Sequence, residues 1–171
     1  KLIPGLFHLE EAGKLPENMK ILSVGRQEVN EDIWQSDIKK MLDEKFKSYD
    51  KKVFDRFIKR NLYHANLPDD PDAFVKFAKR LGNKEVFPQN HAFFLSVRPS
   101  DFSLIVDQLS DVGLLDESEF WRRVLIEKPF GTCLKTAIEL QSSIEKHLKE
   151  SQIYRIDHYL GKFSLQNIMT T

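Results

Sequence analysis

Short apolar runs alternate with longer amphipathic stretches along the chain. Apolar residues at helical spacing predict helices over residues 1–12, 31–49, 53–58, 71–81, 99–109 and 132–148. Short apolar runs predict strands over residues 20–25, 62–66, 92–97, 123–127 and 153–156. Because strands that alternate with helices favour parallel pairing, the pattern predicts an α/β fold. The expected architecture is a doubly wound parallel sheet with helices on both faces.

Two local signals refine this pattern. Asp70-Pro71 marks a helix start, with Asp70 as the N-cap and Pro71 in the first helical position. The run over residues 92–97 is apolar almost without interruption. Such a run indicates a strand that is buried on both faces.

The composition is that of an ordinary globular protein. Of 171 residues, 41% are hydrophobic and 30% are charged, and 26 basic residues balance 26 acidic ones. This balance argues against nucleic acid or a membrane as a partner, and no apolar run approaches the ~20 residues that span a bilayer. The single cysteine, Cys133, excludes an internal disulfide and fits a reducing, cytoplasmic location. The histidines lack metal-ligand spacing, so we expect no metal site.

The densest group of polar side chains follows the strand predicted over residues 153–156. It lies at the carboxyl end of that strand, which is where open α/β sheets bind ligands. His158 and Lys162 are four residues apart, so a helical turn would place both on one face, where they suit an anion such as phosphate. Asp157 is a carboxylate that could orient or stabilise a catalytic imidazole. The alternative is a solvated, charged turn without a ligand.

The ordered string in this group is Asp157-His158-Tyr159-Leu160-Gly161-Lys162. It resembles the active-site signature of glucose-6-phosphate dehydrogenases. The flanking stretches, Gln152-Ile153-Tyr154-Arg155-Ile156 and Gln166-Asn167-Ile168-Met169, also resemble that family, and a weaker resemblance extends over the whole chain. The string is specific, because unrelated proteins rarely share so long an ordered match.

The resemblance implies both a reaction and roles for these residues. The family transfers a hydride from carbon 1 of glucose 6-phosphate to NADP, giving 6-phosphogluconolactone in the first step of the pentose phosphate pathway. His158, Tyr159 and Lys162 would bind the substrate, chiefly at its phosphate. Asp157 would take part in catalysis by pairing with a general-base histidine, which in the family belongs to a later segment and is not in this chain.

Arg26 is the first candidate for cofactor binding. In a dinucleotide-binding fold the residue at the end of the second strand meets the adenosine ribose, and an arginine there accommodates the 2′-phosphate of NADP. The stretch Val24-Gly25-Arg26-Gln27 resembles the family segment that carries this arginine. The alternative is a solvent-facing arginine in a turn.

Lys128 is the second candidate, at the end of a later strand. Pro129 favours an extended Lys128 and so restricts the direction of its side chain. Glu127-Lys128-Pro129-Phe130-Gly131 resembles a family motif whose lysine lies between nicotinamide and sugar, so Lys128 would bind both cofactor and substrate. At Arg98-Pro99 the chain departs from the family, since many members carry two prolines in this loop, which should lie over the cofactor.

The glycine-rich phosphate turn of the family is absent from this sequence, and the resemblance places it directly before Lys1. We therefore expect a Rossmann-type sheet truncated at its first strand, and a fragment that is inactive by itself. Residues 1–157 would form the NADP-binding domain, and residues 158–171 would begin the C-terminal substrate domain. The full-length parent would be a homo-oligomer.

Two other functions stay open at this point. A sugar dehydrogenase of the glucose–fructose oxidoreductase type shares the fold and the Glu-Lys-Pro motif but does not need the phosphate-binding pair His158 and Lys162. A non-catalytic role as a structural or partner-binding piece is also compatible with the sequence. Activity of the full-length protein on free and on phosphorylated sugar separates the first of these from the family prediction.

Overall fold

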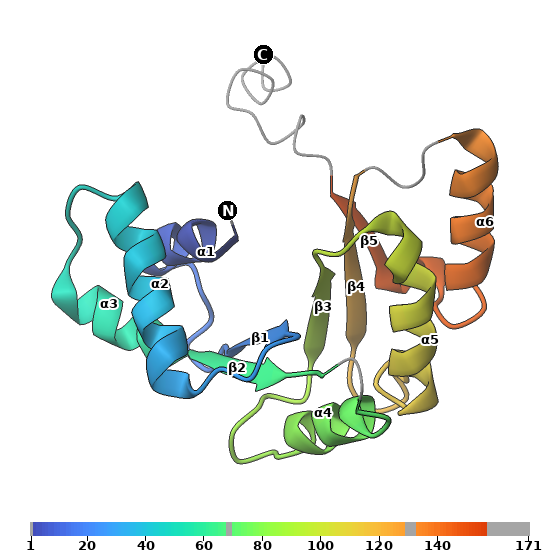
Figure 1. The fold of residues 1–171 in the computed structure, drawn as a ribbon, viewed down its shortest axis with the longest axis horizontal. Coiled ribbons are helices and arrows are strands. Elements are labelled where there is room, and N and C mark those ends of the chain that lie inside the picture. The colour runs from blue at the N-terminus through green and yellow to red at the C-terminus, as the bar shows by residue number, and fades with distance from the viewer. Residues whose placement is uncertain (1, 68–69, 129–132, 157–171) are drawn as a thin grey trace. The chain divides into compact units, whose positions relative to one another are not determined.

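The computed structural model describes residues 2–67, 70–128 and 133–156. The chain divides into two compact units, Lys1–Pro88 and Gln89–Thr171. Each unit holds its own parallel sheet (Figure 1). Within the described residues no helix is long and apolar enough to cross a membrane.

The first unit places four helices around two parallel strands. Its elements are α1 (Leu2–Glu11), β1 (Ile21–Gly25), α2 (Glu31–Lys45), α3 (Lys51–Ile58), β2 (Asn61–Ala65) and α4 (Ala73–Leu81). Ile21 pairs with Asn61 at one end of the strands and Gly25 pairs with Ala65 at the other. The amphipathic pattern predicted each of these elements in the right order.

Helices cover both faces of this small sheet. The ring of Trp34 in α2 lies 5.3 Å from that of Tyr63 in β2. The ring of Phe77 in α4 lies 5.3 Å from that of His64, the next residue of the same strand. Consecutive side chains of a strand point to opposite faces. Therefore α2 and α4 lie on opposite sides of β2, as a doubly wound arrangement requires.

The core of the first unit lies under α1, α2 and α3. Phe7, Ile38, Leu42 and Phe57 are completely buried there. The ring of Phe7 makes edge-on contacts with three other aromatic rings at centroid distances of 5.2–5.3 Å, those of Phe46, Tyr49 and Phe57. Each of these fully buried side chains contributes about 1.5–3 kcal/mol through its removal from water.

A buried ion pair fixes the connection between α1 and β1. Glu10 in α1 is only 2% exposed and pairs with Arg60, whose Nε lies 3.0 Å from the carboxylate, and with Arg56. The Nη1 of Arg60 also donates to three backbone carbonyls of this connection at 2.6, 2.8 and 3.1 Å, those of Pro16, Glu17 and Met19. One guanidinium therefore holds the end of α1 and the chain that leads into β1.

The second unit contains a three-stranded parallel sheet in the order β3-β4-β5. Its elements are β3 (His91–Leu95), the 3₁₀ helix η1 (Pro99–Asp101), α5 (Phe102–Asp111), β4 (Arg122–Glu127), α6 (Leu134–Ile144), the 3₁₀ helix η2 (Glu150–Gln152) and β5 (Ile153–Ile156). Leu95 pairs with Ile126 across β3 and β4, and Glu127 pairs with Ile156 across β4 and β5.

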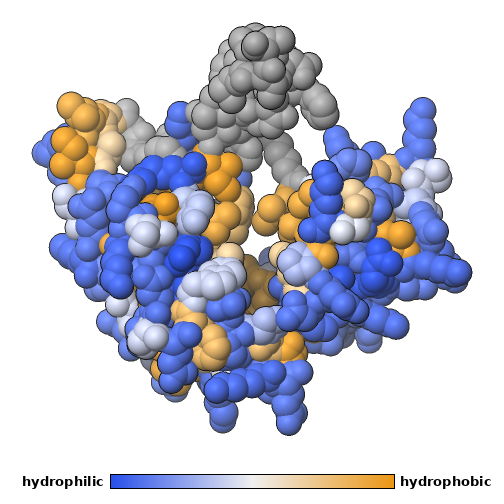
Figure 2. All heavy atoms as spheres, turned by 180° about the vertical axis from the view of Figure 1, so that it is seen from behind, coloured by the Kyte–Doolittle hydropathy of each residue, from blue (hydrophilic) through white to orange (hydrophobic). Residues whose placement is uncertain are grey.

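One face of this sheet is mostly apolar and packs on the helices. Val124 and Ile126 of β4 and Ile153 of β5 are buried. Arg155 lies on the same face, two residues after Ile153, and donates to Gln141 of α6 at 2.7 Å. The core is completed by buried apolar side chains of α5, α6 and the loops after them, which are Phe102, Val106, Leu109, Leu114, Leu115, Ile144 and Leu148. Hydrophilic side chains cover most of the surface seen in Figure 2.

The strand orders agree with the predicted Rossmann-type fold. In a doubly wound sheet of order 3-2-1-4-5-6, the first strand separates the second from the fourth. The pair β2-β1 corresponds to 3-2, and β3-β4-β5 corresponds to 4-5-6. The parallel α/β prediction is confirmed. The described strands form two separate parallel sheets.

Two local predictions were wrong. The strand predicted over residues 92–97 is β3, and in the described structure it is not buried on both faces, because Ala92 is exposed. The helix expected from Pro71 begins at Ala73, with Asp72 in the cap position. Asp70 instead accepts a hydrogen bond from the Asp72 N–H at 3.0 Å, so it closes a turn that precedes α4.

Candidate functional site

The carboxyl ends of β4 and β5 bring two predicted site segments together. Because β3, β4 and β5 are parallel, their carboxyl ends lie along one edge of the sheet. Glu127 pairs with Ile156, and the Lys128 N–H donates to the Ile156 carbonyl at 3.3 Å. The residue that follows Ile156 in the chain is Asp157. The strand register therefore carries Lys128 to the point where the polar string begins.

Lys128 is exposed at this edge, directly after the last residue of β4. This is the strand-end position that the sequence predicted for it. The other predicted residues of this region, Asp157, His158, Tyr159 and Lys162, lie outside the described residues. Their roles, and that of Lys128, stay predictions.

Arg26 follows the last residue of β1 and is exposed. Its side chain forms no hydrogen bond or ion pair with any other residue that the structure describes. Because its guanidinium has no partner among the described residues, all of its N–H donors can bind an anionic ligand. Its exposed position at the end of a strand lets such a ligand approach. These features are compatible with the predicted role of Arg26 at the 2′-phosphate of NADP, which stays a prediction.

The turn that presents Arg26 is fixed by Tyr63. The Tyr63 hydroxyl donates to the Gln27 carbonyl at 3.0 Å. A Cβ on Gly25 would overlap that hydroxyl and would lie 3.0 Å from Cζ of the same ring. A larger residue at position 25 would therefore have to displace the Tyr63 ring. The sequence showed Gly25 as a turn residue but gave no sign of this contact.

Arg98 lies beyond the carboxyl end of β3, in the cap position of η1. Its Nε lies 3.1 Å from one carboxylate oxygen of Asp101, and its Nη2 lies 3.5 Å from the other. The Ser100 hydroxyl also donates to Asp101, at 3.0 Å. The chain thus presents a third exposed basic side chain beyond a strand end, here with a carboxylate beside it.

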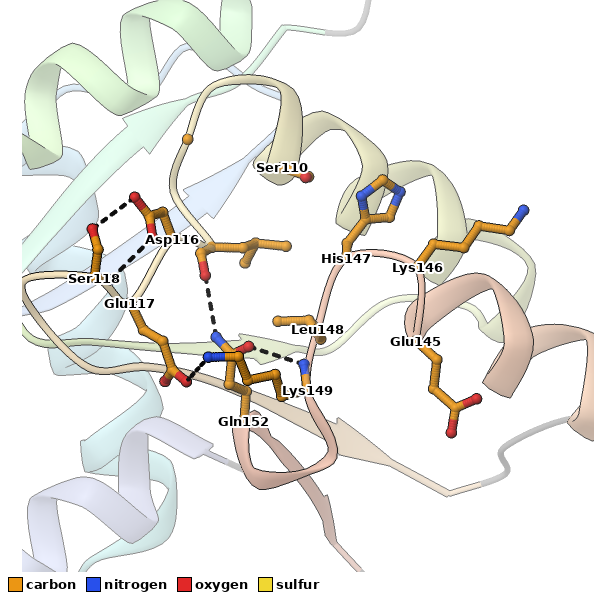
Figure 3. Close-up of a pocket in the computed structure, with 12 residues that line it drawn as sticks. Ser110, Asp116, Glu117, Ser118, Glu145, Lys146, His147, Leu148, Lys149 and Gln152 are labelled. Carbon is orange, nitrogen blue, oxygen red and sulfur yellow. Dashed lines mark hydrogen bonds and ion pairs between the residues drawn. The ribbon is translucent and has the colours of Figure 1, made fainter.

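A pocket of about 590 Å³ opens at the other end of the second unit (Figure 3). It adjoins the starts of β4 and β5. The amide of buried Gln152 donates to the Leu115 carbonyl at 3.1 Å and accepts from the Lys149 N–H at 3.0 Å. Glu117 pairs with Arg123 at 2.8 Å and with Lys149 at 3.3 Å. These groups satisfy one another, and the location is opposite to the edge where open α/β sheets bind ligands. We assign them a structural role.

No metal site emerges from the described residues. No group of three or more histidine, cysteine, aspartate or glutamate side chains among them could hold a metal ion. Cys133 is exposed at the start of α6, and hydrogen bonds from the Thr136 backbone and side chain lower the pKa of its thiol. Its sulfur accepts from the Thr136 N–H and its own N–H donates to the Thr136 hydroxyl at 3.1 Å, so it caps the start of α6.

Comparisons with known proteins agree with this architecture. Residues 1–167 match the family model described as glucose-6-phosphate dehydrogenase, NAD binding domain. Glucose-6-phosphate 1-dehydrogenase from Chlamydia pneumoniae is 34% identical over 183 residues, which cover all of this chain and 35% of the relative. The enzyme of the same name from Caenorhabditis elegans is 35% identical over 176 residues, covering 99% of this chain and 33% of the relative.

Solved structures give the same result. The structure of a glucose-6-phosphate dehydrogenase in complex with its substrate glucose 6-phosphate superposes with a TM-score of 0.84 at 29% sequence identity. The match covers 98% of this chain and 35% of that chain. The chain thus spans about a third of the length of the curated relatives that it matches. The chain belongs to the glucose-6-phosphate dehydrogenase family, in the part that contains its dinucleotide-binding domain.

Proposed function

We propose that the protein containing these residues is an NADP-dependent glucose-6-phosphate dehydrogenase of the pentose phosphate pathway. It would oxidise glucose 6-phosphate at carbon 1 to 6-phosphogluconolactone, and NADP would accept the hydride. The observation that carries this proposal is the hydrogen bond from the Lys128 N–H to Ile156, which joins the Glu-Lys-Pro motif to the start of the Asp157–Lys162 string. The family membership of the chain supports it.

The proposed roles follow the position of each residue. Residues 1–157 would bind the cofactor, and residues 158–171 would begin the substrate domain. Lys128 would lie between nicotinamide and sugar. His158, Tyr159 and Lys162 would bind the sugar phosphate, because a dianion is matched by convergent donors and cations. Asp157 would orient the general-base histidine supplied by a later segment of the protein.

The substrate assignment is tested with Lys162→Ala in the full-length protein. Loss of one charge-assisted hydrogen bond costs ~1.5–3 kcal/mol, so the KM for glucose 6-phosphate should rise about 10- to 150-fold. The slow turnover of unphosphorylated glucose should change much less, since no phosphate is bound. Asp157→Asn should instead lower kcat and leave the KM for glucose 6-phosphate nearly unchanged. Equal losses on both sugars in Lys162→Ala would show that Lys162 does not bind the phosphate.

The cofactor assignment is tested with Arg26→Ala in the full-length protein. The 2′-phosphate loses a charge-assisted partner worth ~1.5–3 kcal/mol, so the KM for NADP should rise while the KM for NAD stays nearly constant. Equal effects on the two dinucleotides would remove Arg26 from the 2′-phosphate site.

We also propose that the 171 residues alone are inactive, because the family's general base lies in the remaining two thirds of the relatives' length. Loss of a general base alone lowers rates by about 10²–10⁴-fold. Turnover of glucose 6-phosphate by the isolated chain at a rate near that of the full-length protein would contradict this. A homo-oligomeric parent and a cytoplasmic location belong to the same proposal. Sedimentation of the full-length protein and imaging of a fluorescent fusion test them.

A further inference from the structure

The loop after β3 carries a side chain that the family resemblance does not explain. Arg98 is 75% exposed and is paired with Asp101 three residues later. Its backbone lies at φ −65° and ψ 145°, and Pro99 follows it in the first position of η1. The Asp101 N–H donates to the Arg98 carbonyl at 2.9 Å, which closes the turn.

The backbone of this turn does not need an arginine. A φ of −65° is the value that a proline ring imposes, and extended backbone is what a following proline favours. The Arg98 N–H donates no hydrogen bond to the part of the chain that the structure describes. The φ of Arg98 therefore already has the value that a proline ring requires. Whatever arginine adds here is added by its side chain.

The location of the loop indicates what that side chain would meet. β3 corresponds to the fourth strand of the order 3-2-1-4-5-6, which begins the second mononucleotide-binding half. Leu95 pairs with Ile126, so the chain leaves β3 at the edge where Lys128 follows β4. Ligands of this fold lie outside the carboxyl ends of the strands at the point where the strand order reverses. The loop that follows β3 lies at the carboxyl end of its own sheet, on the edge where this fold binds ligands.

We propose that Arg98 binds the pyrophosphate of the dinucleotide through the phosphate on the nicotinamide side. This inference rests on the proposed dinucleotide cofactor. A guanidinium presents a planar fork of donors that matches two phosphate oxygens. Its present partner holds it weakly, since an exposed ion pair contributes only about 0–1 kcal/mol. Asp101 therefore orients Arg98 in the free protein and competes with the ligand for it.

The test uses full-length protein with Arg98→Pro and Arg98→Ala, and measures KM and the dissociation constant for NADP and for NAD. Because both dinucleotides carry the pyrophosphate, the constants for NADP and for NAD should rise by the same factor. We expect roughly a tenfold rise, the lower end of the range for loss of a charge-assisted hydrogen bond, because Arg98 is exposed. Arg98→Lys should recover part of the loss. Lys146→Ala removes an exposed charge near the amino ends of the strands and should change neither constant.

A double-mutant cycle isolates the competition with Asp101. Asp101→Asn should tighten dinucleotide binding in the parent protein and have a clearly smaller effect in the Arg98→Pro background. The proposal would be overturned if the dissociation constants of Arg98→Pro and Arg98→Ala stayed within twofold of those of the parent protein. A loss of affinity for NADP but not for NAD would also overturn it. Failure of the proposed function is a separate result, because it would appear as unmodified full-length protein that does not reduce NADP with glucose 6-phosphate.

Discussion

Replacing Arg60 with methionine is the sharpest test of how the first unit is held together. Arg60 is 9% exposed at its side chain and pairs with Glu10, which is 2% exposed. Methionine is of similar length and apolar, so Arg60→Met removes the charge and the donors while keeping most of the packing. The carboxylate of Glu10 then stays buried with only Arg56 beside it.

The expected cost follows from these contacts. Removing one partner of a buried ion pair costs about 3–5 kcal/mol. We expect ~3 kcal/mol, the lower end, because Arg56 still faces Glu10 and the freed carbonyls can turn to water. Arg56→Met is the matched control, since Arg56 contacts the same carboxylate but is 52% exposed at its side chain. That change should cost less than ~1 kcal/mol.

The assay uses the two tryptophans, Trp34 in the first unit and Trp121 in the second. In a Trp121→Phe background, fluorescence during urea unfolding reports the first unit alone. With ~1–1.5 kcal/mol per M of urea for a unit of this size, Arg60→Met should lower the midpoint by about 2–3 M. If that variant is unfolded without urea, Arg60→Lys gives a smaller, measurable loss, because one ammonium cannot reach Glu10 and three carbonyls. Equal midpoints for Arg56→Met and Arg60→Met would refute the reasoning.

Two further predictions concern the strands that present Arg26. Gly25→Ala should destabilise the first unit by about 1–3 kcal/mol, because the added methyl group overpacks against Tyr63, and it should weaken NADP binding by the full-length protein. Adding Tyr63→Phe to this variant should restore part of the stability and part of the NADP affinity. If the second substitution restores neither, the Tyr63 hydroxyl is not the obstacle. Burial, and then the charge of Arg80, lower the pKa of His64, so the unfolded chain takes up a proton before the folded one. The free energy of unfolding should therefore fall as the pH drops below about 6.5 towards the folded-state pKa. His64→Phe should reduce this dependence of the unfolding free energy on pH. His8→Gln, a control at an exposed histidine, should leave it unchanged.

The sequence predicted the elements well because most of them have one apolar face. The helix containing Ile38 and Leu42, and the strand containing Val124 and Ile126, each show the period of the structure that they form. The parallel pairing of the strands follows from the alternation of these elements. What the period does not encode is how deeply each strand is buried. Residues 92–97 carry an apolar pattern typical of a strand buried on both faces, yet Ala92 of β3 is exposed.

Contacts between distant polar residues were also beyond sequence reasoning. Glu10 and Arg60 are separated by 50 positions in an ordinary mixture of charges, and only the fold brings them together. The same is true of Tyr63 and Gly25. A glycine at a strand end indicates a turn, but the obstacle to a larger residue is a side chain from the neighbouring strand. Such reasons become visible only when strand register is known.

Arg26 and Lys128 are held at their strand ends by different kinds of contact. Arg26 depends on side chains, because the Tyr63 hydroxyl fixes the turn through Gln27 and occupies the space that a side chain at position 25 would take. Lys128 depends on backbone register, through its N–H and the Ile156 carbonyl. Substitutions at Tyr63 should therefore displace the turn that carries Arg26. The position of Lys128 depends instead on the register between β4 and β5. A shift of one residue in this register would turn every side chain of β5 to the other face and would displace the chain that follows Ile156.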